Sequence, residues 1–267
     1  MCIMLCMLLN TIVFPAFAHT NPTISVEIID EHGTIFPVYE TGLKQQERTY
    51  RRYLEATRSK NYSIRIRNNS ASRLGLVIAV DGRNIISGKK SWLKQDERMY
   101  VLGPWQSASY EGWRSSESLI NRFYFTDAKD SYAGAWKDHS AMGVIALAVF
   151  EENKPRKPKP LARVPADEAG NDKYGDSSPL FENSVAGTSL KKESRKAGTG
   201  YGEEKYSQVR LVNFSPKQHA SEKHFLKYEW HSTLCEMGVL QCTEPNRNRF
   251  WPEKLSQRDF VPPPPGN

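Results

Sequence analysis

Acidic residues follow two apolar runs in this sequence, and paired carboxylates are the groups that glycan hydrolysis would need. Asp127 and Asp130 follow one run, and Glu151 and Glu152 end another. Two carboxyl groups can act as acid and base, or as acid and nucleophile, only when a fold holds them roughly 5 to 10 Å apart across a cleft. Solvated acids are ordinary at strand ends, so the sequence assigns no catalytic residue.

Histidines and cysteines gather near the C-terminus and form the one metal-type cluster in the sequence. Its members are His219, His224, His231, Cys235 and Cys242. Structural zinc sites use closer ligand pairs, such as cysteines two to four residues apart, and these spacings do not match. Cys235 and Cys242 are instead predicted to form a disulfide, as expected of an exported chain. The sequence therefore predicts no metal and no cofactor.

A polar turn and a Trp-Arg pair are the candidate ligand-binding features. Asp81 begins a predicted Asp-Gly turn, and Asn84 follows that turn. The two side chains could hold a ligand at the rim of a sheet, although Asp and Asn in turns more often form hydrogen bonds with their own backbone. Trp113 and Arg114 would place an indole beside a guanidinium as part of a platform for sugar rings, although aromatic residues mostly serve cores. Three tryptophans on predicted loops would complete that platform, namely Trp92, Trp105 and Trp136.

Other motifs do not meet the requirements of a known site. The glycine-rich run 198–202 follows no predicted strand and opens no clear helix, so it is interpreted as a flexible join and not as a phosphate loop. The serines near His139 and His231 lack the G-x-S-x-G sequence of a nucleophile elbow. The basic run Lys154 to Arg163 could bind an anionic polymer or a membrane surface, but is interpreted as a solvated spacer.

Apolar and polar residues alternate from Ile24 to Glu151, which is the pattern of half-buried β-strands. The run 61–67 alternates cleanly, whereas 74–80 is apolar on both faces and predicts a central strand. Asp81-Gly82 then supplies a strong hairpin signal. Further strands are predicted at 99–102, 107–112, 120–126 and 142–150. Residues 43–56 are compatible with either a helix or a strand.

Composition divides the chain into five parts. We predict a signal peptide at 1–18, an antiparallel β-sandwich domain at 19–152, a basic Pro/Gly/Ser-rich linker or mobile loop at 153–204, a C-terminal strand–strand–helix unit at 205–243, and a disordered proline-rich tail at 244–267. The apolar run near the N-terminus is too short to span a bilayer and ends in an A-x-A cleavage pattern at Ala18. Residues 208–214 and 226–230 of the C-terminal unit partly alternate, as strands do. The unit is too small to fold alone, so we expect it to dock on the sandwich and add strands to it.

The charge balance indicates which partners to expect. The formal net charge is +7, but acidic residues are interspersed among the basic ones, so the sequence carries no nucleic-acid footprint. Attraction to an anionic or glycan polymer of the cell envelope, or to an envelope protein, fits this balance better. No later run is long and apolar enough to predict a transmembrane segment in the mature chain. The sequence leaves the oligomeric state open.

Several short motifs together resemble a widespread family of exported bacterial proteins, mostly Gram-negative. The motifs are VDGRNIISG at 80–88, YVLGP at 100–104, GWR at 112–114, FYFT at 123–126, SYA at 131–133 and GTGYGE at 198–203. The resemblance covers most of the mature chain except the linker and the tail. It implies an exported β-rich domain and carries over no catalytic residue.

The sequence thus predicts a mainly all-β protein, an antiparallel β-sandwich with a small docked C-terminal unit, in the periplasm or outside the cell. The function expected from it is non-enzymatic binding or assembly in the envelope. The alternative is a carbohydrate-binding module or a cell-wall glycan hydrolase.

Overall fold

Strand β4 (Asn61–Asn68) shows how the sequence pattern becomes structure. Tyr62, Ile64 and Ile66 are buried, while Ser63 and Arg65 between them are partly exposed. Side chains point alternately to the two faces of a strand, so this strand places one face in the core and the other toward solvent. The computed structural model describes residues 22–41, 48–153 and 196–242, and the expected strands recur throughout these ranges.

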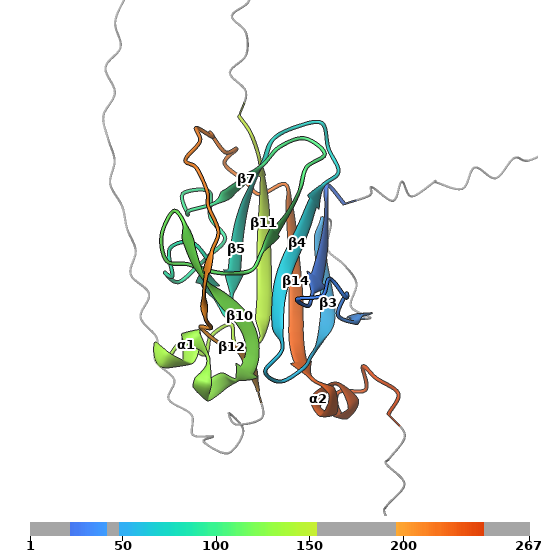
Figure 1. The fold of residues 1–267 in the computed structure, drawn as a ribbon. Helices are drawn as coiled ribbons and strands as arrows, with labels where there is room; N and C mark the ends of the chain where they lie inside the picture. Colours follow the sequence, from blue (N-terminus) through green and yellow to red (C-terminus); the bar gives the residue numbers. More distant parts are fainter. Residues whose placement is uncertain (1–21, 42–47, 154–195, 243–267) are drawn as a thin grey trace, which may run out of the picture.

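The described residues form two seven-stranded open sheets (Figure 1). The first contains β1 (Ile24–Ile29), β4, β8 (Ser107–Tyr110), β9 (Gly112–Arg114), β10 (Leu119–Asp127), β12 (Ala197–Thr199) and β13 (Glu204–Tyr206). The second contains β2 (Val38–Glu40), β3 (Thr49–Ala56), β5 (Leu74–Val80), β6 (Arg83–Asn84), β7 (Tyr100–Leu102), β11 (Val144–Glu151) and β14 (Glu222–Trp230). The predicted all-β sandwich is confirmed.

Aromatic residues from both sheets fill the space between them. Tyr62 stacks on Phe125 with ring centroids 4.3 Å apart, and Phe125 meets Tyr228 of the second sheet at 5.2 Å. Buried aromatic side chains remove large apolar areas from water, so this cluster stabilises the pairing of the sheets. In the described ranges, helical structure is limited to three short pieces, η1 (Ala128–Asp130), α1 (Tyr132–Ala135) and α2 (His231–Glu236).

The Asp-Gly turn after β5 is confirmed. Asp81 and Gly82 have φ values of +49° and +79°, the left-handed conformation that a tight two-residue hairpin requires at both central positions. Val80 pairs with Arg83 across the turn, so β6 runs back along β5. Every residue of β5 is buried, as the apolar character of both its faces predicts.

Strand β14 lies in the middle of the second sheet. It pairs in parallel with β3 on one side and antiparallel with β11 on the other, so the sheet is mixed and not purely antiparallel. The segment 222–230, which the sequence assigns to a C-terminal unit that adds strands to the sandwich, is thus an integral central strand of the second sheet. The ambiguous run before residue 56 is strand β3 from Thr49 onward.

The chain after residue 195 differs from the prediction in two places. Residues 198–202 are not a flexible join, because Ala197–Thr199 form the buried strand β12 against β10. Residues 208–214 alternate like a strand but pair with none in the described ranges. The predicted signal peptide at 1–18, most of the predicted linker and the tail at 244–267 lie outside the described residues. Within the described ranges, neither helix has the length and apolar character needed to cross a bilayer.

Candidate functional site

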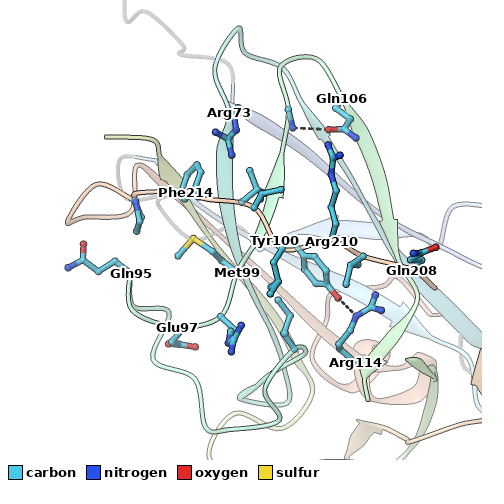
Figure 2. A pocket seen from close by; sticks show the side chains of 18 of the residues that line it. Arg73, Gln95, Glu97, Met99, Tyr100, Gln106, Arg114, Gln208, Arg210 and Phe214 are labelled. Carbon is cyan, nitrogen blue, oxygen red and sulfur yellow. Dashed lines mark hydrogen bonds between the residues drawn. The ribbon is translucent and has the colours of Figure 1, made fainter. Parts of the chain in front are cut away.

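A cleft of about 780 Å³ opens beside the edge strand β7 (Figure 2). Two stretches of chain contribute most of its lining, 95–106, which contains β7, and 208–216. Phe214 and Met99 approach each other over β5 at Gly75, where an added Cβ would lie 2.6 Å from the Phe214 ring and 2.5 Å from the Met99 sulfur. The small residue at position 75 therefore lets the segment 208–216 lie close to the sheet.

Arginine side chains dominate the charge of this cleft. Four arginines and one glutamate line it, namely Arg73, Arg98, Arg114, Arg210 and Glu97. Arg73 pairs with Glu152 at 2.7 Å. For Arg98, Arg114 and Arg210, no carboxylate of the described residues lies within ion-pair distance. The cleft therefore has an uncompensated positive charge that favours an anionic ligand.

Arg114 connects three parts of the site. Its Nε donates to the Tyr100 hydroxyl of β7 at 3.1 Å, and its Nη2 donates to the Ser207 hydroxyl at 3.2 Å. Its Nη1 also donates to the Ser207 carbonyl. All these acceptors are neutral, so Arg114 holds the segment at residue 207 against β7 and β9 without losing its charge.

Asn84 and Glu97 fix the loop that carries Arg98. Asn84 is buried, and its side-chain amide donates to the Arg98 carbonyl at 2.8 Å and to Glu97 at 3.3 Å. Glu97 accepts from the backbone N–H groups of Trp92 and Lys94. Burial alone would raise the pKa of Glu97, but the hydrogen bonds from Lys94 and its neighbours outweigh it and lower that pKa. Asn84 is therefore a supporting residue of the cleft and not a ligand-binding one.

Unpaired backbone lies along both walls of the cleft. Strand β7 pairs with β5 on one side, and no strand in the described part of the chain pairs with its other edge. The backbone N–H groups of residues 210–214 likewise have no hydrogen-bond partner among the described residues. Leu211 and Val212 are 76% and 46% exposed. An edge strand beside extended, unpaired chain is the geometry that accepts an added strand.

Asp81 is buried in the interior and is not available to a ligand at the sheet rim. Its carboxylate accepts hydrogen bonds from the backbone N–H groups of Gly143 and Thr199, both at 2.8 Å, and from the Tyr228 hydroxyl. Burial raises the pKa of Asp81 to about 6, although these donors act in the opposite direction. Asp81 joins β5, β12, β14 and the start of β11, so its role is structural.

Trp113 is also a core residue, which removes the predicted sugar platform at this position. It is 3% exposed, its Nε1 donates to the Gly200 carbonyl at 3.0 Å, and its ring lies 4.5 Å from that of Tyr132. The three loop tryptophans are exposed, but a buried Trp113 offers no face to complete a platform. Of the predicted Trp-Arg pair, only Arg114 reaches the candidate site.

The predicted carboxylates each lie beside a basic side chain. Arg58 pairs with Asp127, Lys217 with Glu151 at 2.5 Å, and Arg73 with Glu152 at 2.7 Å. Asp130 lies 3.9 Å from Lys129. These ion pairs are what solvated strand ends commonly make, and they give no support to two-carboxylate hydrolysis.

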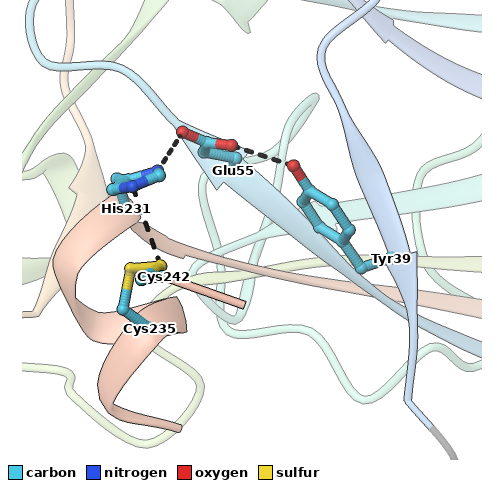
Figure 3. The surroundings of a disulfide bond; sticks show 5 residues. All are labelled: Tyr39, Glu55, His231, Cys235 and Cys242. Carbon is cyan, nitrogen blue, oxygen red and sulfur yellow. Dashed lines mark hydrogen bonds and ion pairs between the residues drawn. A yellow bond between two sulfur atoms is a disulfide. The ribbon is translucent and has the colours of Figure 1, made fainter. Parts of the chain in front are cut away.

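Three members of the histidine and cysteine cluster converge, and two do not. The sulfurs of Cys235 and Cys242 lie at disulfide distance, with Cα atoms 5.5 Å apart, and His231 lies beside them (Figure 3). His224 is buried against Glu222, 2.5 Å away, and its ring stacks on Tyr50. His219 is exposed and lies outside the cluster.

The fold and the cleft together define a β-sandwich protein with an arginine-lined groove at a sheet edge. Comparisons with known protein families, with characterised proteins and with solved structures found no match. Arg73, Arg98 and Arg210 could not be predicted from the sequence as members of one site, because they come from distant points of the chain and share no local motif. The alternation of polar and apolar residues at 208–214 is the one sequence feature that points to this site. It predicts a strand, and in the described ranges this segment pairs with no other strand.

Proposed function

We propose that this protein is an exported, non-enzymatic envelope protein that binds an extended acidic polypeptide in the arginine-lined cleft. The observation that carries the proposal is the group of three arginines, Arg98, Arg114 and Arg210, without carboxylate partners among the described residues. Guanidinium groups make paired, charge-assisted hydrogen bonds to carboxylates, so acidic side chains are natural partners of Arg98 and Arg210. Arg114 contributes mainly its charge, because four of its five N–H donors already bind Tyr100, Ser116 and Ser207.

The free edge of β7 favours a polypeptide over other anions. A peptide that adds as a strand can use the unpaired edge of β7 and the backbone of residues 210–214, while alternate side chains reach the arginines. The main chain of a polysaccharide has no alternating amide N–H and C=O groups at the spacing of a β-strand, so it cannot form such a ladder. The exposed Leu211 and Val212 would gain apolar contacts from the same strand.

Two observations support an exported location. The pattern of residues 1–18 is that of a cleavable leader. Cys235 and Cys242 lie at disulfide distance, and disulfides persist mainly in oxidising compartments. Fractionation of cells that produce the full chain tests this part, because the proposal requires a processed protein that begins after Ala18 outside the cytoplasm.

Binding of a short labelled peptide that alternates glutamate with valine tests the proposed ligand. We expect fluorescence anisotropy to show saturable binding that weakens about tenfold between low and high salt, because exposed charges are screened. The same peptide with glutamine for glutamate should bind at least about tenfold more weakly, since each lost charge-assisted bond is worth about 1.5 kcal/mol or more.

Binding to polyuronate and to insoluble peptidoglycan tests the alternative that the ligand is a carbohydrate. If either polymer is retained while the acidic peptide is not, the carbohydrate-binding alternative replaces the polypeptide. Equal binding of the glutamate and glutamine peptides would show that the arginines do not select the ligand, which contradicts the proposal.

A further inference from the structure

Helix α2 presents His231 and Cys235 on one face. The two residues are four positions apart, and side chains at this spacing are neighbours on a helix. Cys242 returns to the same place from beyond the helix, and its sulfur lies 3.9 Å from His231 Nε2. The three ligand-type atoms lie within 4.8 Å of one another.

Glu55 on β3 fixes the orientation of the His231 ring (Figure 3). One carboxylate oxygen lies 2.8 Å from His231 Nδ1, and the other accepts a hydrogen bond from the Tyr39 hydroxyl at 3.0 Å. A proton on Nδ1 satisfies the carboxylate and leaves the lone pair on Nε2, the nitrogen that faces the Cys242 sulfur. Metal-binding histidines commonly have such a carboxylate on their second nitrogen.

The dimensions of the cluster fit one tetrahedral zinc ion. Zinc bonds of about 2.3 Å to sulfur and 2.0 Å to nitrogen place the sulfurs about 3.8 Å apart and nitrogen about 3.5 Å from each sulfur. The 3.9 Å between His231 Nε2 and Cys242 Sγ already approaches this value. Zinc binding requires the sulfurs to separate and the Cys235 sulfur to lie close to Nε2, and the three ligand-type atoms start within 4.8 Å of one another. His231 and Cys242 are exposed to solvent.

We propose that the Cys235–Cys242 pair, when reduced, binds one Zn²⁺ ion together with His231, so that the disulfide and the metal site are alternative states. A dithiol reductant supplies two electrons and two protons to the sulfur–sulfur bond, gives two thiols and becomes a disulfide itself. Zinc then binds both thiolates and His231 Nε2, two protons pass to the solvent, and water takes the fourth position. Glu55 is a positioning residue in this site.

Cobalt titration of the purified processed chain, which begins after Ala18 and therefore lacks Cys2 and Cys6, tests the proposal, because Co²⁺ reports thiolate ligands by absorption. After reduction with a phosphine, we expect one equivalent of Co²⁺ to give sulfur-to-cobalt charge transfer and the visible bands of a tetrahedral ion. Zinc should abolish both signals. The oxidised protein should show neither. If the reduced protein does not develop this absorption, the proposal is wrong.

Matched variants assign the ligands. We expect His231→Ala to weaken Co²⁺ binding roughly 100-fold and Glu55→Gln about tenfold or more, whereas the exposed His219→Ala should have no effect. Cys242→Ser should lose the charge-transfer band. Equal affinity of the His231 and His219 variants would overturn the assignment.

The melting temperature of the reduced chain shows whether the folded state holds the ion. A ligand that binds only the folded state raises the melting temperature. We therefore expect zinc to raise it in the reduced protein and to leave it unchanged in Cys242→Ser. If zinc does not change the melting temperature of the reduced protein, the proposal is wrong.

Discussion

Replacing Asp81 with alanine is expected to lower the free energy of unfolding by about 4 kcal/mol near neutral pH. The variant removes the acceptor for the N–H groups of Gly143 and Thr199 and for the Tyr228 hydroxyl, all of them buried. A buried donor without a partner costs about 1 to 3 kcal/mol, and the variant leaves two such N–H groups. It also removes one of the two hydrogen bonds of the Tyr228 hydroxyl, which keeps Thr199 Oγ1 as a partner. Urea unfolding monitored by tryptophan fluorescence measures the loss.

Asp96→Ala is the matched control, because Asp96 is exposed and should contribute less than about 0.5 kcal/mol. If the two variants are equally stable, the Asp81 carboxylate does not join the strands as described.

The pH dependence of the same variant provides a second measurement. Burial raises the pKa of Asp81 from 3.8 to about 6, so the folded protein holds this proton more tightly than the unfolded chain. The protonated Asp81 carboxyl therefore adds to the free energy of unfolding. This added stability is fully present below about pH 4 and is lost as the pH rises through about 6, which lowers the free energy of unfolding by up to about 3 kcal/mol. The stability difference between wild type and Asp81→Ala should shrink over this interval, and a constant difference would contradict the shifted pKa.

Charge reversal at two arginines is the second change with a large expected effect. Arg98→Glu combined with Arg210→Glu should raise the Kd for the acidic peptide about 100-fold, because two charge-assisted contacts of about 1.5 kcal/mol each become repulsive. Both side chains are exposed, so the fold should persist. Anisotropy titration measures the affinity, and circular dichroism checks the fold.

The control for that variant reverses two other exposed charges. Lys60 and Lys223 are exposed and do not line the cleft, and their double replacement by glutamate changes the net charge equally. We expect this control to bind within about threefold of wild type, because distant charges are screened by salt. Similar losses in both variants would mean that net charge, and not the cleft, attracts the peptide.

Local sequence patterns were sufficient for most strands but not for their arrangement. Tyr62, Ile64 and Ile66 alternate with polar residues, so the buried face of β4 could be predicted directly. The turn at Asp81-Gly82 needs positive φ, which these two residue types tolerate. In contrast, the place of β14 between β3 and β11 depends on pairings more than 70 residues away in sequence, and no local pattern encodes them.

The candidate site was harder to predict because its residues act through tertiary contacts. Arg114 was singled out from its sequence, but its partner Trp113 is buried because β9 turns the indole toward Tyr132. Asn84 and Asp81 bond the backbone, as turn residues commonly do. The arginines at 73, 98 and 210 meet only when the segment 208–216 lies across β5 and β7.

Hydrogen exchange of the complex with the acidic peptide tests strand addition most directly. If the peptide pairs with β7, those amides of Tyr100–Leu102 that point away from β5 and the unpaired amides of residues 210–214 should exchange at least about tenfold more slowly at saturation, while those of the buried strand β5 stay unchanged. A saturated complex in which these amides exchange as fast as in the free protein would contradict binding at this sheet edge.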